Sequence, residues 1–173
     1  MLEELLAGPG TRTLAVYLVA PETRLAVLIP GVISLAILGY YARQGKVSHR
    51  LQLIWVLTLG MSFYFARWEI TEELQRLYIY SAFSVACVLL LFKRIYIAPA
   101  LAYALTFLAL WWVDVVHALC RALEYGADLD QFYRGVGGAG AVDGLVLVPL
   151  MTAAAVAYAA GRIRSRGERL AEL

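Results

Sequence analysis

The chain has 173 residues, of which 62% are hydrophobic and 16% charged, and its formal net charge is +2. Soluble domains average about 45–50% apolar and about 25% charged residues, so a water-soluble fold of this length could not bury this much apolar surface. The small net charge gives no reason to expect a nucleic-acid partner, and two cysteines without a CxxC motif exclude a disulfide framework. The composition therefore predicts an integral membrane protein.

Five stretches of 16 to 19 residues contain no charged residue: 25–42, 51–66, 77–92, 95–113 and 144–161. A membrane-spanning helix needs about 20 mostly apolar residues, and charged residues at its ends can reach the interface. We therefore predict an all-α fold, a polytopic transmembrane helix bundle with about five spans. The predicted spans are 21–44, 49–68, 72–93, 97–125 and 142–163. Hydropathy leaves open that one of these stretches is re-entrant.

The ends of the chain are predicted to lie outside the bundle proper. Residues 14–20 are apolar but too short to cross, so residues 1–20 are interpreted as a short segment at the outer interface. Residues 21–165 form a single bundle, and residues 164–173 form a basic tail.

Helix-boundary residues agree with these spans. Ser48 is placed to cap the second helix, and Thr71 to cap the third, with two glutamates in the turn that follows it. Pro99 belongs in the first turns of the fourth helix. Pro30 is expected to kink the first helix and Pro149 to bend the fifth.

The basic residues are distributed unevenly between alternate connections. On one side of a five-span chain lie nine basic residues: Arg43, Lys46, Arg50, Lys93, Arg94, Arg162, Arg164, Arg166 and Arg169. On the other side, six arginines are diluted by acids that include Glu69, Glu72, Glu73, Glu124, Asp128, Asp130 and Asp143. The positive-inside rule then predicts a cytoplasmic C-terminus and an outer N-terminus. Arginine accounts for 13 of the 15 basic residues, which favours a bacterial cytoplasmic (inner) membrane.

A polar stripe on the fourth predicted helix is the main candidate for chemistry. Asp114, His117, Arg121 and Glu124 follow one another at spacings of 3, 4 and 3, so they share one face about 80° wide. Asp114 lies about 22 Å along a helix that starts near Pro99, because each residue adds about 1.5 Å. This depth is inside the outer leaflet, where an ionised carboxylate facing lipid costs several kcal/mol. The stripe should therefore face protein or water.

Two interpretations of the stripe remain open. In the structural one, Asp114, His117, Arg121 and Glu124 form an ion-pair network with Arg67 that attaches the fourth helix to its neighbours. In the functional one, an Asp–His pair shuttles protons or performs acid–base chemistry at the outer face. The catalytic candidates are then Asp114, His117, Glu124 and Asp143, although Asp143 also fits a first-turn acid on a helix dipole. No metal-binding motif is present, and neither a metal nor another cofactor is expected.

The fifth predicted helix has small residues at Ala153, Ala157 and Gly161, a spacing that lets another helix approach closely. This face serves either packing within the chain or a contact between subunits. The arginines that follow, at positions 162, 164, 166 and 169, are expected to meet anionic lipid headgroups.

No catalytic or phosphate-binding motif occurs in the sequence. Our first hypothesis is a non-enzymatic subunit of a homo- or hetero-oligomeric membrane assembly, as a channel, translocation or accessory component. Its partners would be membrane lipids, other membrane subunits or copies of itself. The alternatives are a membrane-embedded enzyme for a lipid or lipid-linked substrate, or a proton-coupled carrier using Asp114 and His117.

Overall fold

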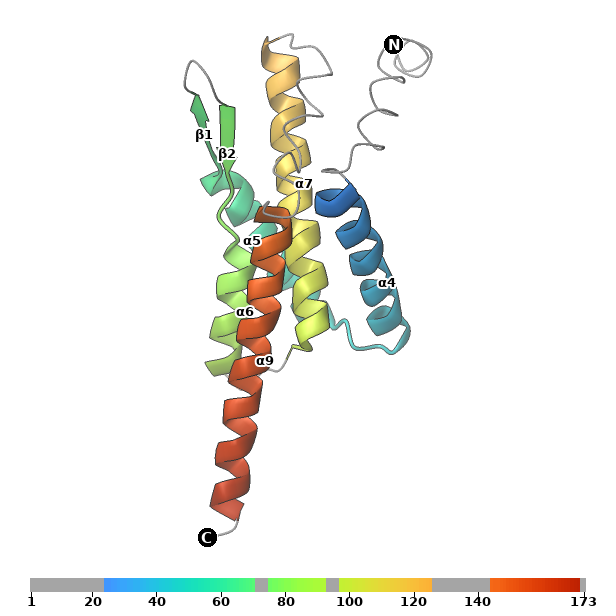
Figure 1. The fold of residues 1–173 in the computed structure, drawn as a ribbon, viewed down its shortest axis with the longest axis vertical. Helices are drawn as coiled ribbons and strands as arrows, with labels where there is room; N and C mark the ends of the chain where they lie inside the picture. The colour runs from blue at the N-terminus through green and yellow to red at the C-terminus, as the bar shows by residue number, and fades with distance from the viewer. Residues whose placement is uncertain (1–23, 71–74, 93–96, 126–143, 172–173) are drawn as a thin grey trace.

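The computed structural model describes residues 24–70, 75–92, 97–125 and 144–171. In these ranges the bundle consists of five α-helices: α4 (Ile29–Arg43), α5 (His49–Phe65), α6 (Ala82–Phe92), α7 (Pro99–Tyr125) and α9 (Gly144–Ala171) (Figure 1). A π-helical turn, η1 (Arg24–Leu28), leads into α4. The helical bundle predicted from the sequence is confirmed.

Helix α7 is the centre of the bundle and packs against α4, α5, α6 and α9 (Figure 1). Ala102, Ala104 and Ala109 on α7 are all buried, and such small side chains let neighbouring helices approach closely. The indole N–H of Trp55 on α5 donates a hydrogen bond to the backbone oxygen of Leu105 on α7, at 2.8 Å. This bond attaches α5 to the N-terminal third of the central helix.

Each helix runs antiparallel to the one before it in the chain, so the connections between helices fall at two ends of the bundle (Figure 1). The hairpin end contains the β-hairpin between α5 and α6, the start of α4 and the C-terminal part of α7 (Figure 1). The turn end contains the α4–α5 turn, the start of α7 and the C-terminal part of α9 (Figure 1).

The connection between α5 and α6 differs from the prediction. We expected helix from 49 to 68 and again from 72 to 93, but β1 (Arg67–Ile70) and β2 (Gln75–Tyr78) form an antiparallel hairpin and α6 begins only at Ala82. Pairing β1 with β2 satisfies backbone groups beyond the end of α5 that a continuing helix would otherwise have satisfied. The proposed cap Thr71 lies outside the described residues.

The other helix boundaries agree more closely. Ser48 caps α5, because its Oγ accepts a hydrogen bond from the backbone N–H of Leu51 at 3.2 Å. Pro99 is the first residue of α7. Pro30 lies in the first turn of α4, directly after η1, and Pro149 is buried inside α9. Helix α9 continues to Ala171, so most of the predicted tail is helical. Residues 1–20 lie outside the described part of the chain.

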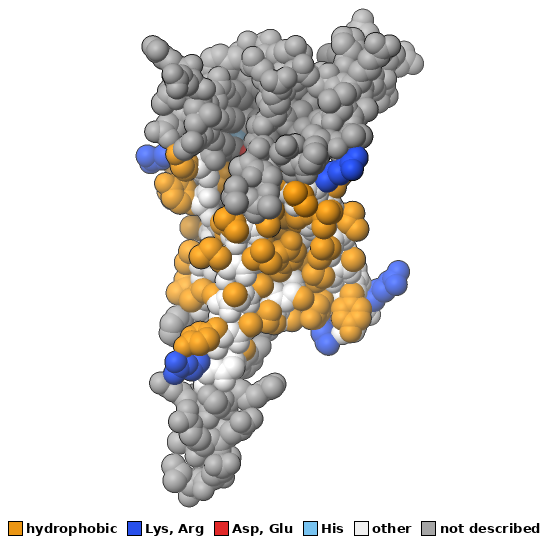
Figure 2. All heavy atoms as spheres, viewed as in Figure 1, with side chains coloured by type: hydrophobic (Ala, Val, Ile, Leu, Met, Phe, Trp, Pro, Cys, Tyr) orange, Lys and Arg blue, Asp and Glu red, His pale blue; other side chains and the backbone are white. Residues whose placement is uncertain are grey.

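Three helical segments are long and apolar enough to cross a membrane: Arg24–Arg43, Pro99–His117 and Gly144–Arg162. Figure 2 shows a belt of apolar side chains across the visible face of the described middle of the bundle, with lysine and arginine side chains at its upper and lower margins. The belt contains large side chains that are about half exposed or more, such as Val32, Tyr64 and Met151. So much exposed apolar surface fits lipid as its solvent.

Candidate functional site

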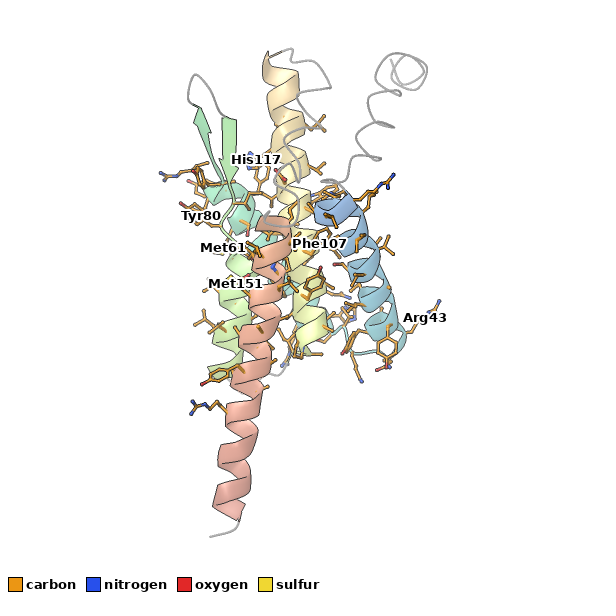
Figure 3. The ribbon with its side chains drawn as sticks, in the orientation of Figure 1. Arg43, Met61, Tyr80, Phe107, His117 and Met151 are labelled. Atoms are coloured by element: carbon orange, nitrogen blue, oxygen red, sulfur yellow. The ribbon has the colours of Figure 1, made fainter. Side chains whose placement is uncertain are left out.

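His117 lies on α7 near the hairpin end of the bundle (Figure 3), and Asp114 lies one turn before it on the same helix. Asp114 is 8% exposed, and His117 is partly buried. Leu110, one turn before Asp114, packs in an apolar cluster with Phe107 and Leu145. Asp114 is therefore enclosed by the bundle, and His117 is enclosed in part.

His117 is attached to the C-terminal turn of α5. Its Nε2 lies 3.1 Å from the backbone oxygen of Phe63, and its ring stacks on the Phe63 ring with centroids 4.3 Å apart and planes at 29°. The last carbonyls of a helix have no partner within the helix and carry the negative end of its dipole, so an imidazole N–H is a suitable partner for one of them. The Phe63 oxygen also accepts a longer bond, of 3.3 Å, from the backbone N–H of Ala66.

This bond determines where the proton of His117 resides. A backbone carbonyl can only accept, so Nε2 must donate and a neutral ring is protonated at Nε2. In an Asp–His pair used for base catalysis, the carboxylate holds the Nδ1–H and Nε2 stays free to take a proton. In this structure Nε2 is occupied by the bond between α5 and α7. Base chemistry at Nε2 would require that bond to break.

The other residues predicted for the network are placed only in part. Arg67 is the first residue of β1, and its side chain is exposed. Arg121 and Glu124 belong to α7, but their side chains lie outside the described part of the structure, as does all of Asp143. Among the described residues, no three His, Cys, Asp or Glu side chains are grouped to hold a metal ion.

A second polar cluster, which we did not predict, joins α5, α6 and α9. The hydroxyls of Ser81 and Ser84 are 2.6 Å apart, and the hydroxyl of Thr152 on α9 lies 2.7 Å from that of Ser84. Ser62 on α5 accepts a 3.0 Å bond from the backbone N–H of Ala82. The only sequence signal was a hydroxyl residue in each of three apolar stretches, and spacing along one helix cannot pair residues on different helices.

The small-residue face of α9 points mostly outward. Ala153 is partly buried, whereas Ala157 and Gly161 are exposed. A methyl group added at Gly161 would meet no atom within 4 Å. The neighbouring Arg162 donates to the Tyr158 hydroxyl from Nε at 3.0 Å and from a terminal nitrogen at 2.7 Å. The side chains of Arg164, Arg166 and Arg169 lie outside the described part of α9.

No protein-family model, curated protein or solved structure matches this chain.

Proposed function

We propose that this chain is a multi-pass membrane protein that acts as a non-enzymatic subunit of an oligomeric membrane assembly, with a second copy of the chain as its first partner. The hydrogen bond from His117 to the Phe63 oxygen carries the proposal. It assigns the histidine of the polar stripe a structural task, holding α5 on α7, and leaves its Nε2 unavailable as a base.

The outward face of α9 supports the assembly. Ala157 and Gly161 are exposed, and small residues four positions apart let helices of two subunits approach closely enough for van der Waals packing in lipid. A symmetric dimer uses the same patch on both copies, so one helix face suffices for both sides of the contact.

We further propose five crossings, with the hairpin end outside and the turn end in the cytoplasm of a bacterial inner membrane. Helix α5 has 17 residues and α6 has 11, about 26 Å and 17 Å at 1.5 Å per residue. The crossing that contains α6 would be completed by the non-helical residues before Ala82. Irregular backbone is tolerated at membrane depth when protein covers it and its polar groups have partners. The N–H of Ala82 has such a partner, the hydroxyl of Ser62.

Oligomerisation is tested by measuring the mass of the purified chain in mild detergent by light scattering. Gly161→Leu should convert a defined oligomer to monomer, because a large side chain blocks close approach of α9. Ala155→Leu is the matched control, since Ala155 is also exposed on α9 but lies on a different face. A wild-type chain that is monomeric at every concentration, or equal behaviour of the two variants, would refute the subunit contact.

The crossings are tested by labelling with a maleimide that cannot cross membranes. Cys120 is exposed toward the hairpin end, whereas Cys87 is buried. Cys120 should react in intact cells. A cysteine at the exposed Gln44, in a variant without Cys120, should react only after permeabilisation. Labelling of both positions from the same side would refute the proposed arrangement.

One observation favours a second candidate, a proton-coupled carrier. Asp114 is buried within an apolar segment that is long enough to cross a membrane, and buried carboxyl groups at such depth are typical of proton pathways. A carrier would show pH-driven flux in liposomes that Asp114→Asn abolishes while the protein stays folded. The subunit proposal expects no such flux.

A further inference from the structure

We propose that the turn between α4 and α5 binds the headgroups of anionic phospholipids. The site consists of three exposed basic side chains, Arg43, Lys46 and Arg50. It goes beyond the proposed function, because it assigns a ligand class to a surface that takes no part in the α9 contact.

The turn has a fixed backbone. Gly45 has φ of 65°, its N–H donates to the Ala42 oxygen at 3.0 Å, and the N–H of Lys46 donates to the Tyr41 oxygen at 3.0 Å. These two bonds form a Schellman motif, which closes the C-terminal end of α4. Since Ser48 caps the following helix, both ends of the turn are held, and the three basic side chains extend from an ordered frame.

The charged side chains that the structure describes at the turn are all basic: Arg43, Lys46 and Arg50. Asp114, the one acid whose side chain is described, lies one turn before His117 on α7, and Figure 3 places His117 near the opposite, hairpin end. The Lys46 ammonium lies 5.8 Å from the centre of the Tyr41 ring. Arg50 is in the first turn of α5, where the helix dipole disfavours a cation, so its charge does not serve helix stability. An anion placed among the three residues would compensate this charge.

The apolar surface next to the turn selects a lipid over a free anion. Leu35 and Tyr40 on α4 are 61% and 60% exposed, and Leu53 on α5 is 60% exposed. Figure 2 shows lysine and arginine side chains at the lower margin of the apolar belt, and Figure 3 places Arg43 at the turn end. A phospholipid contacts both surfaces at once, with its acyl chains on the belt and its phosphate at the turn, whereas inorganic phosphate contacts only the second.

The experiment measures lipid retention by native mass spectrometry of the purified full chain, after incubation with phosphatidylglycerol or phosphatidylcholine in detergent. The wild-type chain should retain more phosphatidylglycerol than phosphatidylcholine. Each basic residue near a phosphate raises the binding affinity about fivefold. The triple variant R43Q/K46Q/R50Q should therefore lose the preference by at least about fivefold, and by about a hundredfold if the three contributions add. The matched control R24Q/R67Q removes two exposed arginines from the hairpin end and should keep the preference.

Several results would overturn the proposal: no preference for phosphatidylglycerol in wild type, an equal loss in R24Q/R67Q, or a full block of lipid retention by millimolar inorganic phosphate. If the triple variant does not fold, the salt dependence of lipid retention by the wild-type chain tests the site instead. Retention of phosphatidylglycerol should then fall steeply between 50 mM and 500 mM salt, while retention of phosphatidylcholine stays constant. Equal salt dependence for the two lipids contradicts the site.

Discussion

The attachment of α5 to α7 through His117 leads to a quantitative prediction, because two substitutions separate its hydrogen bond from its ring stacking. His117→Phe keeps a ring against Phe63 and loses the bond to the Phe63 oxygen. Phe63→Leu keeps the bond, since the acceptor is a backbone oxygen, and loses the stacking. His117→Ala loses both contacts.

The expected costs follow from the geometry. Side-chain hydrogen bonds between membrane helices contribute about 0.6 kcal/mol on average, and the Phe63 oxygen keeps its second donor, Ala66, when His117 is removed. We therefore expect His117→Phe to lower the free energy of unfolding by about 0.6 kcal/mol. Aromatic stacking adds about 0.5–1.5 kcal/mol, which is the expected cost of Phe63→Leu. His117→Ala should cost the sum, about 1–2 kcal/mol.

The assay is reversible unfolding in mixed micelles of a mild detergent and dodecyl sulfate, followed by circular dichroism. The double variant F63L/H117A should be less destabilised than the sum of the two single variants, because both remove the same stacking contact. Additive costs would show that the rings of His117 and Phe63 do not stack in the folded protein. A His117→Ala variant as stable as wild type would show that His117 does not hold α5 on α7. That result would also remove the main support for a structural polar stripe.

The remaining predictions concern packing and buried hydroxyls, and each can be measured in the same unfolding assay except the last. Gly31→Ala should stabilise α4 by up to about 1 kcal/mol, because alanine favours helix and the added methyl would meet the facing phenylalanine ring at an ordinary 3.7 Å; a loss of stability would contradict this packing. Ser34→Ala should be neutral or stabilising, since the Ser34 hydroxyl is buried without a hydrogen-bond partner in the described structure; a loss above about 1 kcal/mol would reveal a partner. Thr152→Val should cost about 0.6–1 kcal/mol, because it removes the bond between α9 and α6, whereas Thr152→Ser should cost less. Cys120 should react with a maleimide in the folded protein within minutes, while Cys87, which is 1% exposed, should react only after unfolding; equal rates would contradict the packing of α6.

The helical segments could be predicted because lipid imposes a strict local requirement. A backbone in hydrocarbon must satisfy its own hydrogen bonds, so apolar stretches bounded by charges indicate helices whatever their neighbours are. Helix capping is equally local: Ser48 caps α5 and Pro99 begins α7, as predicted from the sequence. The hairpin was missed because residues 67–70 and 75–78 pair their backbone groups across strands, and that pairing depends on which residues face each other.

The sequence by itself determined that Asp114 and His117 share one face of a helix near one end of the bundle, since helical periodicity fixes which residues of a helix lie together. Only the tertiary structure decided what His117 contacts, a backbone oxygen at the end of α5, whereas the sequence left open an ion-pair network or an Asp–His pair with a chemical role. A backbone acceptor exists at every position and leaves no mark in the residue pattern. The partner of His117 is therefore set by where α5 ends, and that point depends on how the helices pack around α7.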